Sequence, residues 1–61
     1  MIVLTIKIKG ETTAYTKKEY LQDNFSVSKS NPILQKMVET AIEAARLDSV
    51  EEVQLTARFE W

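Results

Sequence analysis

The absence of histidine and cysteine is the feature that most constrains what this 61-residue chain can fold into. A chain of this length buries only about 60% of the surface that its unfolded form exposes, so its core is marginal. Small domains offset that deficit with disulfides, a structural metal or oligomerisation. Without cysteine no disulfide can form, and without both residue types no zinc site is expected. We therefore expect a single domain over residues 1–61 that is stabilised by packing and by self-association as a homodimer.

The overall composition is that of an ordinary globular protein. Hydrophobic residues make up 44% of the chain and charged residues 28%, a balance that argues against disorder. The apolar start at residues 1–6 is soon interrupted by Lys7 and Lys9, so it is too short for a membrane-spanning helix. It also lacks the basic region and the cleavage site of a signal peptide. We expect a cytoplasmic protein, a compartment in which disulfides are rare.

The small net charge hides an uneven distribution along the sequence. Residues 1–36 carry an excess of three positive charges, whereas residues 37–61 carry an excess of four negative charges. Such clustering is typical of an ordinary solvated surface. It is also compatible with a basic face that binds a polyanion, or with complementary ends that meet in an oligomer.

The first residues predict a β-strand that is buried on one face. The apolar residues Ile2, Leu4, Ile6 and Ile8 alternate with Val3, Thr5, Lys7 and Lys9, which indicates a sheet covered on one side. Gly10 and Glu11 then predict a turn, because glycine adopts a positive φ freely. The β-forming residues 12–16 predict a short second strand, so that the two strands form a hairpin.

Residues 16–30 leave two alternatives open. Thr16 and Glu19 have the spacing of a capping box, which predicts a short helix that ends at Asp23. A short extended stretch through Phe25 and Val27 would follow it. The alternative is an irregular loop fixed by its few apolar side chains. We favour the helical turn, since a structureless loop of this length is unusual in a small domain.

A helix is predicted from Pro32 to about Leu47. Ser30 or Asn31 can cap its first N–H groups, and proline suits the first helical position. The spacing of its apolar residues predicts one buried stripe, made of Leu34, Met37, Val38, Ala41, Ile42 and Ala45.

A final strand is predicted from Val53 to Trp61, where apolar and polar residues alternate again. The expected fold is an α+β domain of β-β-α-β order, with one helix on a three-stranded mixed sheet. A long strand–helix–strand crossover favours parallel pairing, so the two terminal strands are expected to be adjacent and parallel. The uncovered face would then carry Val3, Thr5, Lys7, Gln54, Thr56 and Arg58.

No pattern in the sequence predicts an enzyme. Glu51 and Glu52 are adjacent and point to opposite faces of a strand, while Glu39 and Glu43 lie on the solvated face of the helix. The serines have no histidine partner, and no phosphate-binding or zinc motif is present. We expect no catalytic residues, no cofactor and no metal.

Binding of another protein, or of a second copy, is the function that the sequence favours. The expected contact residues are Trp61, Arg58, Thr56 and Lys7. Phe59 is predicted to complete the core beneath the helix, and Trp61 is equally compatible with core and interface. We interpret the chain as a small non-enzymatic interaction or regulatory module that acts through the face or the edge of its sheet, since the last strand leaves an edge at which a second copy can pair. Phages and mobile elements use accessory proteins of this size.

Weak nucleic-acid binding is the alternative. A basic, aromatic patch near the hairpin would bind phosphates and stack on bases. Its expected residues are Lys7, Lys9, Lys17, Lys18, Tyr15 and Tyr20. The scarcity of arginine and the slightly acidic composition argue against this function.

Overall fold

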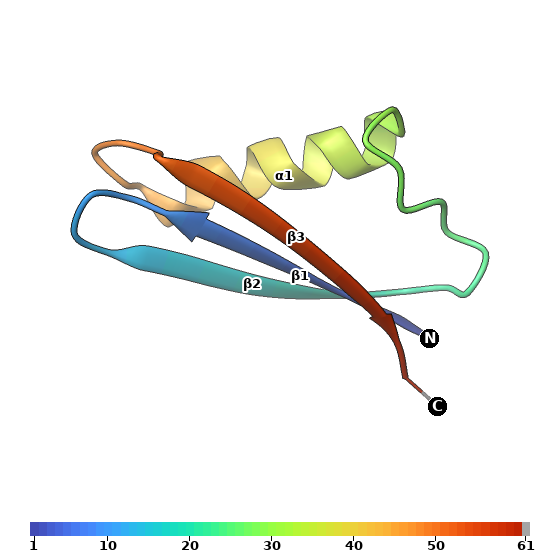
Figure 1. The fold of residues 1–61 in the computed structure, drawn as a ribbon. Helices are drawn as coiled ribbons and strands as arrows, with labels where there is room; N and C mark the ends of the chain where they lie inside the picture. Colours follow the sequence, from blue (N-terminus) through green and yellow to red (C-terminus); the bar gives the residue numbers. More distant parts are fainter. Residues whose placement is uncertain (61) are drawn as a thin grey trace.

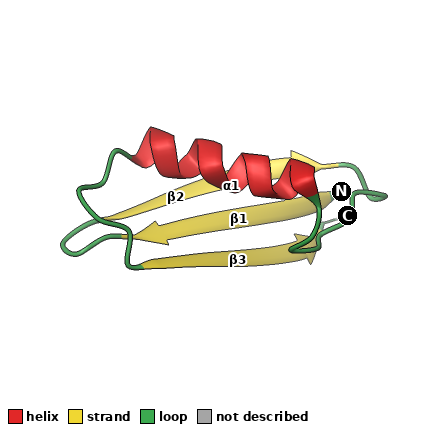
Figure 2. Cartoon of the chain, turned by 90° about the horizontal axis from the view of Figure 1, so that it is seen from above, coloured by secondary structure: helices red, strands yellow, loops and turns green. Residues whose placement is uncertain are grey.

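A computed structural model describes residues 1–60 of the chain (Figure 1). It contains strand β1 (Ile2–Lys9), strand β2 (Ala14–Leu21), helix α1 (Pro32–Ala45) and strand β3 (Glu52–Phe59). The strands form one sheet in the order β2-β1-β3, and α1 lies across one face of it (Figures 1 and 2). The predicted β-β-α-β order and the layer of one helix on three strands are confirmed.

The predicted parallel pairing of the terminal strands is wrong, because β1 pairs antiparallel with β3 as well as with β2. The prediction treated the helix as a crossover from β1 to β3. The hairpin, however, has already reversed the chain, so the crossover starts from β2. The helix returns the chain to the hairpin end of the sheet, and β3 then runs in the direction of β2 (Figure 2). The two parallel strands are therefore β2 and β3, and β1 separates them.

The core is built on β1, the central strand. Its side chains toward α1 are almost completely buried, as predicted: Ile2 at 4% exposure and Leu4, Ile6 and Ile8 at 0%. From the helix, Leu34 and Ala41 complete the buried cluster.

The hairpin turn at Gly10 is confirmed, but the reason for its glycine differs from the expected one. Gly10 does not have a positive φ. Gly10 is buried instead, and a Cβ atom there would lie 2.9 Å from the carbonyl oxygen of Ser49. The glycine is required because the loop that leads into β3 passes directly over the hairpin turn.

The predicted short helix within residues 16–22 is wrong, since β2 continues to Leu21. Residues 22–31 form the loop, and they contain no strand around Phe25. The strand was not predicted because Lys17 and Glu19 lie on the side of β2 that faces α1, so its sequence lacks the apolar–polar alternation typical of a strand. Phe25 still packs against the core, so the loop is anchored at that point.

The helix is confirmed, with a start at Pro32 and an end two residues before the predicted one. The side chain of Asn31 caps it by accepting a hydrogen bond from the backbone N–H of Ile33, at 3.0 Å. The helix ends because Arg46 adopts the left-handed conformation, with φ 50°. This position is usually filled by glycine, which has no Cβ penalty there.

One helix is too narrow to cover three strands. A helix is about 10–12 Å wide with its side chains, and adjacent strands lie about 4.8 Å apart. Figure 2 shows α1 above β2 and β1, with β3 clear of it. Every residue of β3 is exposed. The prediction that Phe59 belongs to the core is therefore wrong, because it is 61% exposed. Trp61 lies outside the described residues.

Candidate functional site

The sheet has a face that α1 does not cover, which we call the open face. Residues directly opposite each other in an antiparallel sheet point to the same side, so the register assigns the side of every strand residue. The open face consists of Val3, Thr5, Lys7, Lys9, Ala14, Thr16, Lys18, Tyr20, Glu52, Gln54, Thr56 and Arg58. It is mainly polar, with basic residues in excess of acidic ones.

The structure brings together three of the four residues that the sequence predicted for partner binding. Lys7, Thr56 and Arg58 all lie on the open face. Lys7 belongs to β1, and the other two belong to β3, opposite residues of β1 that point to the same side. The grouping holds although the strands are antiparallel, because side-chain alternation has the same period in both arrangements. Val3, also predicted for this face, is only 1% exposed, because Tyr20 and Arg58 flank it on the neighbouring strands. The fourth residue, Trp61, lies outside residues 1–60.

The residues predicted for nucleic-acid binding are divided between the two faces. Lys7, Lys9, Lys18 and Tyr20 lie on the open face, and Tyr20 is 63% exposed. The remaining two, Tyr15 and Lys17, lie on the helix side. There Tyr15 packs against the core and Lys17 forms an ion pair with Glu19, at 3.4 Å. Only four of the six residues can therefore contact one ligand on the open face.

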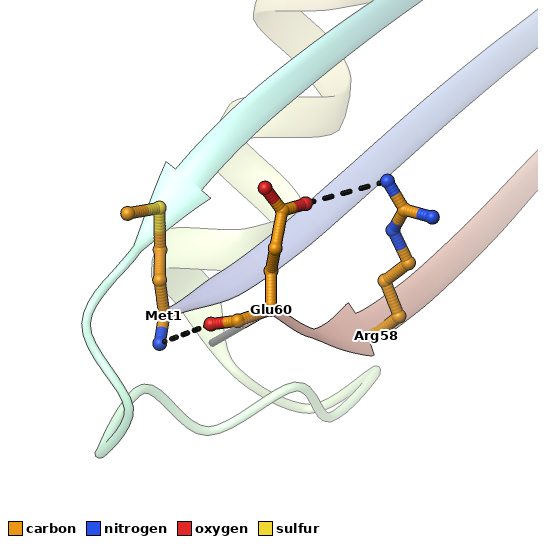
Figure 3. A network of polar contacts seen from close by, with 3 residues as sticks. All are labelled: Met1, Arg58 and Glu60. Carbon is orange, nitrogen blue, oxygen red and sulfur yellow. Dashed lines mark hydrogen bonds and ion pairs between the residues drawn. The ribbon is translucent and has the colours of Figure 1, made fainter.

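Polar contacts hold the end of β3 in place (Figure 3). The backbone N–H of Glu60 donates to the carbonyl oxygen of Met1 at 2.8 Å, and the N-terminal amine of Met1 donates to the carbonyl oxygen of Glu60 at 3.2 Å. Arg58 Nη2 lies 3.3 Å from Glu60 Oε2. The two backbone bonds define Met1 and Glu60 as a hydrogen-bonded pair of the β1–β3 ladder.

That pair sets the direction of the backbone groups along β3. Hydrogen-bonded pairs recur at every second residue of an antiparallel ladder. Gln54, Thr56 and Arg58 therefore direct their N–H and C=O groups to β1. The backbone groups of Val53, Leu55 and Ala57 point the other way, to the outer edge of the sheet. Within residues 1–60 no strand lies beyond this edge.

The same residues of β3 carry apolar side chains that α1 leaves uncovered. Val53 is 37% exposed and Leu55 is 38% exposed. Leu55 forms one wall of a groove of about 380 Å³, and helix α1 forms the other with Leu34 and Val38. Lys29, Gln35 and Glu39 also line the groove. The open edge of the last strand was predicted from the sequence, whereas the apolar groove beside it was missed. The signal was present, since one helix is narrower than a three-stranded sheet.

A second groove, of about 390 Å³, lies on the other flank of α1, along β2. Its walls include the Lys17–Glu19 ion pair and the apolar side chains of Ile33 and Met37. Both charged residues lie on β2, an edge strand, where charged side chains discourage pairing with a further strand. Among residues 1–60, no three acidic side chains come close enough to hold a metal ion.

Comparison with protein-family models, with curated proteins and with solved structures gave no match to this chain. Within residues 1–60, no helix is both long and apolar enough to cross a membrane. The geometry of the chain itself is therefore the basis for inferring its function.

Proposed function

We propose that this chain is a non-enzymatic protein-interaction module that binds an extended segment along the outer edge of β3. One observation carries the proposal. The backbone groups of Val53, Leu55 and Ala57 point outward from a strand that α1 does not cover, beside an apolar groove. Strand addition uses these two elements, since main-chain hydrogen bonds give affinity and pockets for alternate side chains give specificity.

The geometry also defines the kind of segment that fits. An added strand would place every second side chain on the helix side, next to Leu55 and the groove. Those side chains must be apolar, because they complete the layer that α1 leaves uncovered. The intervening side chains would extend the open face beside Gln54 and Thr56 and should be polar. A regulatory role, a relation to phage accessory proteins and a cytoplasmic location stay predictions from the sequence.

Selection from a random-peptide library displayed on phage tests the proposal. We expect the enriched peptides to alternate between apolar and polar residues and to shift the backbone amide signals of β3 in NMR titrations. Ala57→Pro removes one outward N–H and should weaken binding at least about tenfold, since a ladder bond is lost and the ring blocks the edge. Thr16→Pro, at an outward position of β2, is the matched control and should bind like the unmodified chain.

Two results would contradict strand addition at β3. In the first, enriched peptides shift the amides of β2 or of the open face and leave those of β3 unchanged. In the second, Ala57→Pro binds the peptides as tightly as the unmodified chain does.

Nucleic-acid binding is a second candidate, favoured by the open face alone. Lys7, Lys9 and Lys18 can contact phosphates there, and the exposed ring of Tyr20 can stack on a base. Fluorescence anisotropy with labelled single-stranded DNA at low salt is the test. Lys7→Ala should reduce the slope of the logarithm of the binding constant against the logarithm of the salt concentration by about 1, the loss of one phosphate contact. Lys36→Ala, at an exposed position of α1, should leave this slope unchanged. An absence of binding at low salt would remove this candidate.

A further inference from the structure

The two edges of the sheet differ in their resistance to pairing. The middle of β2 carries three consecutive charges, Lys17, Lys18 and Glu19. Charged side chains on an edge strand, lysine in particular, discourage the addition of another strand. The middle of β3, from Val53 to Ala57, carries no charge. The edge open to association is therefore the β3 edge.

The sequence of β3 has a chemical symmetry about Leu55. Counting outward in both directions, the first residues are polar (Gln54 and Thr56) and the second are apolar (Val53 and Ala57). The third are of opposite charge: Glu52 precedes Leu55 by three residues, and Arg58 follows it by three. An antiparallel pairing of two such strands centred on Leu55 places each residue opposite its symmetric counterpart.

We infer that the segment bound at the β3 edge is the β3 strand of a second copy, antiparallel and centred on Leu55. This inference rests on the proposed function and names its partner. Val53 of one copy then exchanges both hydrogen bonds with Ala57 of the other, and the two Leu55 residues do the same with each other. All these backbone groups are the outward-pointing ones.

Charge favours this register over the one centred on Thr56. In the register centred on Leu55, Glu52 lies directly opposite Arg58 of the second copy, and the dimer contains this pair twice. A register centred on Thr56 would place Glu52 opposite Glu60 of the second copy, and like charges in that position are destabilising. In the isolated chain, Arg58 contacts Glu60 at 3.3 Å and Glu52 accepts a hydrogen bond from Gln54 at 3.1 Å. Both contacts are exposed, so they compete weakly.

The layers also fit in this arrangement. A two-fold axis perpendicular to the sheet puts both helices, and the apolar side chains of both β3 strands, on the same side. The two β1 strands would lie three strand spacings apart, about 14 Å. Helices of about 10–12 Å diameter pass each other at that distance. The slot between them lies above the two Leu55 side chains. A parallel pairing would instead set the apolar side of one strand beside the polar side of the other.

Charge exchange at two positions tests the inference. Glu52→Arg and Arg58→Glu each place like charges opposite one another, twice per dimer. Sedimentation equilibrium at low salt should show a dissociation constant at least about tenfold higher for each single variant. The double variant, Glu52→Arg with Arg58→Glu, restores opposite charges and should recover the affinity of the unmodified chain. An equimolar mixture of the two single variants should form mixed dimers, because their charges are complementary.

Each outcome distinguishes the second copy from other partners. Both side chains are exposed, and circular dichroism verifies that every variant keeps its fold. An unmodified chain that stays monomeric at millimolar concentration, or single variants that dimerise normally, would overturn the inference. In either case, peptide binding at β3 that is sensitive to Ala57→Pro would still support the proposed function. If no peptide binds at β3 but the dimer responds to the Glu52 and Arg58 substitutions as expected, the β3 edge serves self-association alone.

Discussion

Proline at adjacent positions of β3 should have opposite consequences for folding. The N–H of Thr56 points to β1, where Thr5 is its opposite residue, whereas the N–H of Ala57 points to the outer edge. Thr56→Pro therefore removes a bond within the sheet, and its ring projects toward β1. Ala57→Pro removes a donor that faces the edge and leaves the β1–β3 ladder intact.

The expected difference is large compared with the stability of so small a domain. A chain of this length has a free energy of unfolding of roughly 3–9 kcal/mol. Thr56→Pro loses one ladder bond, worth about 1 kcal/mol, and leaves the carbonyl of Thr5, a half-buried residue, without its donor, at about 1–3 kcal/mol more. The total of about 2–4 kcal/mol removes at least about a fifth of the stability. Ala57→Pro should cost less than about 1 kcal/mol, since its position is exposed.

Urea denaturation followed by circular dichroism measures both values. The protein concentration must be kept well below the dissociation constant of any dimer, so that folding alone is compared. Equal destabilisation by the two variants, or a greater loss for Ala57→Pro, would refute the assignment of inward and outward backbone groups on which the interaction proposals depend.

Three further substitutions test the account of the fold by the same measurement. Ile6→Ala removes a completely buried side chain of β1 and should cost about 2–5 kcal/mol; a cost below 1 kcal/mol would contradict its place in the core. Gly10→Ala should cost roughly 1–3 kcal/mol, because its Cβ would lie 2.9 Å from the backbone oxygen of Ser49. Arg46→Gly should raise stability by about 0.5–1 kcal/mol, since residue 46 has a positive φ; a loss would show that the arginine side chain matters more than the backbone strain.

The elements that the sequence predicted correctly are those whose apolar pattern is set by the one face that the element buries. The alternation of Ile2, Leu4, Ile6 and Ile8 reflects a strand with one face against a helix. The apolar stripe of α1 and its Asn31 cap are equally local signals. The grouping of Lys7, Thr56 and Arg58 on one face was predictable as well, because it depends only on the period of a strand.

The errors concern properties that no local pattern encodes. Strand direction depends on how many times the chain reverses between two strands. The length of β2 was not predicted because Lys17 and Glu19, charges typical of an edge strand that must not pair further, interrupt the apolar–polar alternation. The exposure of Phe59 depends on which strands α1 covers, which follows from the order of strands in the sheet. An open edge at the last strand was predictable, but the residues that direct their backbone groups to it could be assigned only from the register of β3 with β1.

Amide hydrogen exchange along β3, measured residue by residue, tests the open edge most directly. In dilute solution the amides of Gln54, Thr56 and Arg58 should be protected, and those of Val53, Leu55 and Ala57 should exchange rapidly. As the concentration rises, the second set should gain protection while the first set changes little. Uniform protection of both sets at every concentration, or protection of the second set alone in dilute solution, would contradict an edge that is free to accept a strand.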